Sequence, residues 1–342
     1  MKRASLWAAG IVALLLLLLL LAFRLSPWPS AAVITYMFSR GDDASEAALE
    51  KHVPAGIVAR RDLAYGPGRD ERFDLYHPAG STAPRRMIVW VHGGAWIAGS
   101  KDGVANYLKV LAGHGYATVA VEYSTGFGST YPRPVEQVNA ALGHLVREAG
   151  ALGIAPGRIV LAGDSAGAQI AAQIALLTTD PAYARAVGIA PALRPGQLSA
   201  LLLVSGAYDV GTINLEGDHG WFLKTVLWAY SGTRNFLEDD RFRLASITPN
   251  VTPAFPRSFL SSGNADPLAP QAVALAEKLR SIGVETDTLF FPADYRPPLP
   301  HEYQFNLDTA AGRQALAAML AFIEEDAPAS PPAAAAGPGQ AP

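Results

Sequence analysis

Residues 158–168 read Arg-Ile-Val-Leu-Ala-Gly-Asp-Ser-Ala-Gly-Ala and carry the strongest structural signal in the chain. An apolar run of strand length comes first, followed by a turn with one glycine on each side of Asp164-Ser165-Ala166 and then by the helix-forming segment 168–175. A strand, a sharp turn and a helix in this order are typical of α/β proteins that hold a nucleophilic serine at the top of a sheet. Glycine is needed at 163 and 167 because neighbouring backbones come very close in such a turn. The stretch predicts an α/β sheet and makes Ser165 a candidate nucleophile.

A second glycine-containing turn lies upstream, in Met-Ile-Val-Trp-Val-His-Gly-Gly-Ala-Trp, residues 87–96. An acyl-transfer site must donate hydrogen bonds to an oxyanion, and the backbone amides of a Gly-Gly turn do so without obstruction from side chains. The residue that follows the nucleophile supplies a further amide. We therefore predict that Gly93, Gly94 and Ala166 form an oxyanion hole. An ordinary tight turn with an incidental histidine is the alternative, and the order of the two motifs along the chain disfavours it.

Two histidines follow the serine, and one of them is the candidate base. His301 lies in a loop between the apolar stretch 286–291 and the C-terminal helical pattern. His219 lies in a polar, glycine-flanked segment, residues 216–220, that is typical of a surface turn. We predict that His301 is the base.

The acid of such a triad precedes the histidine along the chain. Asp266 follows the strand-like run 257–260 directly, and we predict that it is the triad acid. Asp209 also follows a strand-like run and is the main rival. Asp287 falls inside a strand pattern and Asp294 lies in a proline-rich loop, so both are more consistent with structural roles.

These motifs together resemble one enzyme family. His-Gly-Gly-Ala-Trp at 92–96, Gly-Asp-Ser-Ala-Gly at 163–167, Asp-Pro-Leu at 266–268 and the late His301 are similar to the α/β-hydrolase esterases of the hormone-sensitive-lipase and feruloyl-esterase/kynurenine-formamidase type. The resemblance covers about residues 56–326. Ala95 is a departure, since many members carry a third glycine there. The resemblance implies an α/β-hydrolase fold and a serine esterase.

Eight strand-like runs alternate with helical periods across this region, which predicts a mostly parallel eight-stranded sheet flanked by helices. Candidate catalytic residues at the carboxyl ends of strands fit the general rule for such sheets. The predicted strands are 57–64, 72–77, 87–92, 117–123, 158–163, 199–205, 257–262 and 284–291.

An insert at about 206–256 contains an aromatic-rich helical segment, residues 220–230. Core packing, a cap over the active site and a membrane-surface segment are three possible roles for it. The resemblance implies that this region forms a cap over the active site, as inserts here often do in the family. The candidate substrate-binding residues are Trp96, Tyr123, Trp221 and Trp228. For Trp96 the alternative is a brace for the oxyanion loop, and for Tyr123 it is core packing.

The expected reaction is ester hydrolysis by a serine nucleophile through an acyl-enzyme. The expected substrates are small-molecule carboxylic esters of small or medium acyl groups. An amidase or formamidase with the same triad is an alternative, and a non-catalytic scaffold used for binding is a weaker one. We expect no cofactor and no metal, because the histidines are scattered, no His-Glu-x-x-His motif occurs and the chain has no cysteine.

Composition sets broad limits on the function. The chain has 342 residues, of which 50% are hydrophobic, enough for a large core. Its 27 Lys and Arg against 30 Asp and Glu give no basic excess, which argues against a nucleic-acid partner.

The first 25 residues resemble a membrane anchor. Lys2 and Arg3 precede an uncharged apolar stretch, residues 6–23, which Arg24 ends. As a helix, this stretch would be about 27 Å long, close to the ~30 Å of the hydrocarbon core. Because basic residues are richer on the N-terminal side, we expect the catalytic domain on the extracytoplasmic side. The alternative is a signal peptide cleaved near Ser30-Ala31-Ala32, which would give a secreted or periplasmic protein.

Two further segments complete the predicted domain organisation. Residues 26–55 are expected to be a linker or stalk with a short helix at 42–50. Residues 327–342 are almost wholly Ala, Pro and Gly, and we expect them to be a disordered tail.

Overall fold

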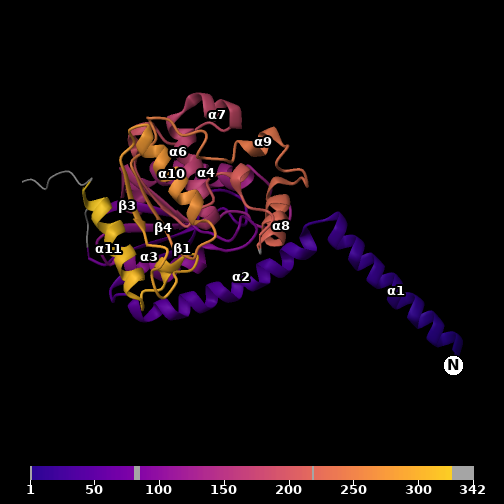
Figure 1. Ribbon diagram of the computed structural model, residues 1–342. Coiled ribbons are helices and arrows are strands. Elements are labelled where there is room, and N and C mark those ends of the chain that lie inside the picture. Colours follow the sequence, from indigo (N-terminus) through magenta and orange to yellow (C-terminus); the bar gives the residue numbers. More distant parts are fainter. Residues whose placement is uncertain (1, 81–84, 218, 326–342) are drawn as a thin grey trace, which may run out of the picture.

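The computed structural model describes residues 2–80, 85–217 and 219–325. A single eight-stranded sheet in the order β1-β2-β4-β3-β5-β6-β7-β8 forms its centre (Figure 1). The strands from β4 to β8 in that order are parallel, whereas β2 pairs antiparallel with both of its neighbours. The predicted fold is confirmed. The strands are β1 (Ile57–Ala64), β2 (Arg72–Pro78), β3 (Arg85–Val91), β4 (Ala117–Val121), β5 (Ile154–Asp164), β6 (Leu198–Val204), β7 (Ser258–Ser262) and β8 (Thr286–Phe290).

Helices cover both faces of the sheet. Alternate residues of β3 face opposite sides: Val89 joins the core under α4 and α6, whereas Ile88 and Trp90 join the core under α3 and α11. Such alternation buries both faces of central strands. The helices are α1 (Lys2–Leu25), α2 (Trp28–Leu49), α3 (Ala105–Ala112), α4 (Arg133–Arg147), α5 (Ala149–Leu152), α6 (Ser165–Thr179), α7 (Pro181–Val187), α8 (Gly220–Ser231), α9 (Asp240–Arg243), α10 (Ala269–Ser281) and α11 (Ala310–Glu325).

The insert between β6 and β7 contributes α8, α9 and the short turn η4 (Val210–Thr212). One side of α8 is buried, with Val226, Leu227 and Tyr230 in the core, and another side packs against α2. Core packing therefore accounts for much of the aromatic content of this segment.

The segment that the sequence suggested to be a linker forms one long helix, α2, rather than a short helix at 42–50. Pro29 lies in its first turn, where proline is well tolerated. Ala31 and Ile34 are buried against the domain, and the carboxylate of Glu46 accepts hydrogen bonds from the N–H of Asn106 at the start of α3 (2.9 and 3.1 Å). Helix formation continues upstream of residue 42 because these apolar residues find a tertiary partner.

Helix α1 leaves the domain at a sharp bend after Leu25 (Figure 1). Within the described residues, no single helix reaches the length and hydropathy of a membrane span; Ala9–Leu25 and Trp28–His52 reach them together, across a bend of 82°. The tail predicted at 327–342 lies outside the described residues.

Candidate active site

The turn between β5 and α6 holds Ser165 in a strained conformation. Its φ of 50° lies in the left-handed region, which a non-glycine residue adopts only where the surroundings enforce it. Close packing enforces it here: a Cβ at Gly167 would collide with the carbonyl of Val91, and one at Gly163 with the backbone of Gly167. The serine therefore lies at the carboxyl edge of the central strands, as the sequence predicts.

Ser165, His301 and Asp266 lie in one hydrogen-bonded row. His301 Nε2 is 3.0 Å from Ser165 Oγ, and His301 Nδ1 is 3.0 Å from Asp266 Oδ1. Asp266 is buried and also accepts hydrogen bonds from the Ser262 hydroxyl and the Leu268 N–H, both at 2.8 Å. The structure thus brings together the three residues that the sequence proposes as a triad.

The rival residues have other surroundings. Asp209 accepts hydrogen bonds from the Gly211 N–H and the Ser246 hydroxyl at the η4 turn. His219 is exposed and lies immediately before α8. Neither is placed in the row that contains Ser165.

Opposing effects set the pKa values of the acid and the base. Burial would raise the pKa of Asp266, but its hydrogen bond and charge interaction with His301 hold that pKa below its ordinary value. Burial would lower the pKa of His301, but the carboxylates of Glu302 and Asp266 raise it to about 9. Glu302 Oε1 lies 3.5 Å from His301 Nε2. The site therefore favours the imidazolium.

The oxyanion loop differs from the sequence prediction in one respect. The Gly93 N–H donates to Asp164 Oδ2 at 2.8 Å, so this amide is already engaged. Within the described residues the N–H groups of Gly94 and Ala95 donate to no backbone carbonyl, and the Ala166 N–H lies in the first turn of α6, where amides lack intrahelical acceptors. Among the described residues, Gly94, Ala95 and Ala166 therefore keep amides that are not engaged as the Gly93 amide is.

Asp164 fixes the position of the oxyanion loop. Its carboxylate accepts hydrogen bonds from Trp90 Nε1 (2.6 Å) and the Gly93 N–H (2.8 Å), and Glu302 forms a carboxyl–carboxyl contact with it. Burial and this neighbouring carboxyl raise the pKa of Asp164 well above its ordinary value. The serine motif alone gives no sign of this role, because Trp90 and Gly93 lie 74 and 71 residues away in the sequence.

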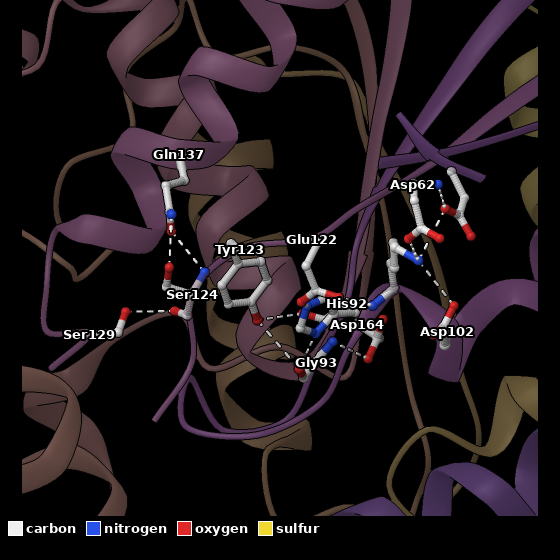
Figure 2. Close-up of polar contacts among 12 residues, drawn as sticks. Asp62, His92, Gly93, Asp102, Glu122, Tyr123, Ser124, Ser129, Gln137 and Asp164 are labelled. Carbon is white, nitrogen blue, oxygen red and sulfur yellow. Dashed lines mark hydrogen bonds and ion pairs between the residues drawn. The ribbon is translucent and has the colours of Figure 1, made fainter. Parts of the chain in front are cut away.

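Behind the loop, a buried polar network supports His92 (Figure 2). The imidazole stacks on Tyr123 with ring centroids 4.2 Å apart, and the Tyr123 hydroxyl donates to the His92 carbonyl at 2.8 Å. His92 Nε2 lies 3.3 Å from Glu122 Oε1. The network holds the backbone immediately before the oxyanion amides.

None of the four candidate substrate-binding residues lines the cavity that adjoins His301. Trp96 and Tyr123 are buried, and the Trp96 indole N–H donates to Gln169 Oε1 at 2.9 Å, which braces the loop. Trp221 and Trp228 line a separate hollow together with Phe23 of α1. This placement differs from the expected pocket because local sequence does not tell a buried aromatic residue from a pocket-lining one.

A cavity of about 680 Å³ adjoins His301, Glu302 and the oxyanion loop. Helix α2 forms one wall, which the sequence did not predict. The α2 residues in this wall are Met37, Phe38, Gly41, Asp42, Ala44, Ser45 and Ala48. Across the described ranges, no group of three or more His, Asp or Glu side chains is arranged to hold a metal ion.

The chain is similar in sequence to several esterases. It is 24% identical over 247 residues to an esterase of Gibberella moniliformis, covering 70% of this chain and 76% of that protein. It is 29% identical over 237 residues to the esterase LipQ of Mycobacterium tuberculosis, covering 66% of this chain. A probable isoprenylcysteine alpha-carbonyl methylesterase of Oryza sativa is 28% identical over 239 residues, covering 68% of this chain. The chain spans only about half of the last two proteins, 53% and 55%.

Solved structures agree with the fold. Esterase B from Lactobacillus rhamnosis superposes with a TM-score of 0.77 at 20% identity, covering 88% of this chain and 95% of that one. A bacterial heroin esterase superposes with a TM-score of 0.69 at 23% identity, covering 90% of this chain and 96% of that one. The family model described as BD-FAE matches residues 73–279, more than half of the chain. With these matches and the geometry above, the chain belongs to the BD-FAE family of α/β-hydrolase esterases.

Proposed function

We propose that this esterase cleaves carboxylic esters of small or medium acyl groups through a Ser165–His301–Asp266 triad. The observation that carries the proposal is the hydrogen-bonded row, with 3.0 Å on each side of the imidazole. A serine hydroxyl is a weak nucleophile until an adjacent base takes its proton, and this row provides that base. The names of the relatives, which include esterases and a methylesterase, support an ester substrate.

In the acylation step, neutral His301 takes the proton of Ser165 while the serine oxygen attacks the ester carbonyl. Asp266 remains ionised, fixes the orientation of the ring and stabilises the imidazolium. The N–H groups of Gly94, Ala95 and Ala166 would receive the oxyanion; losing one such donor typically costs about 3 kcal/mol of transition-state stabilisation.

Collapse of the tetrahedral intermediate expels the alcohol, which takes its proton from His301. Water then attacks the acyl-enzyme with His301 again as the base, and the acid is released as Ser165 regains its proton. Every proton passes through one imidazole, so the protonation state of His301 should control the rate.

A fluorophosphonate probe tests the nucleophile. The native protein should become labelled and hydrolyse acetyl, butyryl, octanoyl and feruloyl esters, whereas Ser165→Ala should do neither. Equal labelling of both proteins would contradict the assignment of Ser165. Faster turnover of N-formyl amides than of any ester would favour the alternative that the protein is an amidase or formamidase.

We also propose that α1 anchors the protein in a membrane with the catalytic domain on the extracytoplasmic side. The uncharged stretch 6–23 behind Lys2 and Arg3 supports this orientation. Signal cleavage near Ala32 is disfavoured, because Ser30 and Ala31 are buried against the domain and cleavage would remove them. An intact N-terminus in the membrane fraction and digestion by external protease are expected; a soluble chain starting near Val33 would refute the anchor.

A further inference from the structure

The first half of α2 carries apolar residues on more than one side. Ala31 and Ile34 are buried against the domain, whereas Val33, Tyr36 and Met37 face outward with 49%, 59% and 67% of their surface exposed. The exposed residues follow the i, i+3, i+4 spacing of a single helical face. A helix with one apolar side on the core normally presents polar residues on the other, so this outer face is unusual for a surface that meets only water.

The position of this face relates it to α1. The bend between α1 and α2 is 82°, so α2 would run nearly parallel to the surface of a bilayer that α1 crosses upright. Figure 1 shows α1 leaving on the side of α2 that lies opposite the sheet. The exposed face of α2 therefore points toward the same side as the apolar helix.

Other exposed apolar side chains gather near the bend. Phe127 is 84% exposed and packs edge-on against Trp28, with ring centroids 5.1 Å apart. Trp221 is 60% exposed and lines a hollow of about 570 Å³ together with Phe23 and Pro27. Three elements distant in sequence thus contribute large apolar groups to one region around the end of α1.

Basic side chains accompany these aromatic rings. The Arg40 guanidinium lies 5.2 Å from the centre of the Tyr36 ring, and that of Arg234 lies 5.1 Å from the centre of the Trp228 ring. Arg24 ends the apolar stretch of α1. Aromatic and basic residues at the end of an apolar helix are typical of the headgroup region of a membrane, where each has an apolar body and a polar tip.

We propose that this elbow surface, made of Val33, Tyr36, Met37, Phe127 and Trp221, inserts into the headgroup region of the bilayer that holds α1. The inference rests on the membrane anchor proposed above. Met37 belongs both to the elbow surface and to the wall of the cavity beside His301. One wall of that cavity would then lie at the membrane surface, and the substrate would be an ester dissolved in the outer part of that membrane.

The absence of cysteine makes a direct test possible. Full-length Val33→Cys, labelled with a polarity-sensitive fluorophore, would be reconstituted in vesicles of phosphatidylcholine and phosphatidylglycerol. Ser281→Cys on α10, an exposed position away from the elbow surface, is the matched control. Spin-labelled lipid should quench the label at 33 and leave the one at 281 bright, whereas aqueous iodide should do the opposite.

Each other outcome overturns the inference in its own way. If iodide quenches the label at 33 as strongly as the label at 281 in vesicle-bound protein, the anchor stands but the elbow surface does not insert into the headgroup region. A label at 33 protected from both quenchers points to a second copy of the chain as the occupant. Protein that does not float with the vesicles refutes the anchor, and the inference falls with it.

A kinetic test asks whether docking matters for the substrate. Val33→Ser combined with Tyr36→Ser changes two outer residues that do not line the cavity. The variant should float with vesicles and hydrolyse a water-soluble butyrate ester like the native protein, while losing about tenfold or more of its activity on a vesicle-embedded ester. Equal changes on both substrates would contradict the proposal.

Discussion

At the scale of single residues, Glu302 is the closest charged neighbour of the base other than the triad acid. It raises the pKa of His301, which reaches about 9, and the imidazolium must lose its proton before it can accept one from Ser165. Activity on a soluble ester should therefore rise with pH and reach half of its plateau near pH 9. Glu302→Gln removes the nearby charge and should move this midpoint to lower pH, as measured by kcat/KM between pH 6 and 10.

The matched control for this change is Glu277→Gln, an exposed carboxylate on α10. It should leave the midpoint where the native protein has it. An unchanged midpoint in Glu302→Gln, or an equal shift in the control, would show that the neighbouring carboxyl does not set the protonation of the base.

Ala95 is the second informative residue. Its φ of 52° is left-handed, a conformation that costs a non-glycine residue about 1–2 kcal/mol and glycine almost nothing. Glycine loses more entropy on folding, by about 0.5–1 kcal/mol, so Ala95→Gly should raise the free energy of unfolding by roughly 0–1.5 kcal/mol. Urea titration measures the change. Gly94→Ala should be strongly destabilising in the same assay, because its Cβ would collide with the Ala98 carbonyl.

At the scale of elements, the oxyanion loop depends on the end of β5. Asp164 uses both carboxylate oxygens as acceptors, for Trp90 Nε1 and the Gly93 N–H. Asp164→Asn would turn an amide N–H toward one of these donors and displace the loop. Since misplacement by about 1 Å can cost 10²-fold in rate, kcat should fall by about that factor with little change in KM.

Asp209→Asn is the control for this prediction, because Asp209 also follows a strand but supports only the η4 turn. It should retain native kcat, which would also exclude it as the triad acid. If Asp164→Asn kept native kcat as well, the loop would not depend on this carboxylate.

Elements also differ in how well the sequence predicts them. The eight strands were recognisable because each is a short apolar run bounded by turn residues, and the serine turn carries its own glycine signature. The extent of α2 was missed because its apolar residues are stabilised by a surface that exists only after the domain folds. The engagement of Gly93 was missed for a similar reason, since its acceptor lies 71 residues away on another strand.

At the scale of the whole molecule, the sequence predicted which three residues lie in one hydrogen-bonded row but not what encloses them. Order along the chain identified Ser165, Asp266 and His301, because parallel strands bring their carboxyl ends to one edge. The cavity wall came from α2, upstream of every motif, and no local pattern links that helix to the site. Trp96 and Tyr123 show the same limit: their burial depends on neighbours such as Gln169 and His92.

The sharp bend between α1 and α2 has a practical consequence for preparing a soluble form of the enzyme. A chain that starts at residue 56, where the motif-bearing region begins, would lack one wall of the cavity and expose the core that Ala31 and Ile34 cover. A chain that starts at Ser26 would lose only α1 and would keep the serine hydroxyl that accepts the Trp28 N–H at the start of α2. The useful cut for crystallisation therefore lies at the bend.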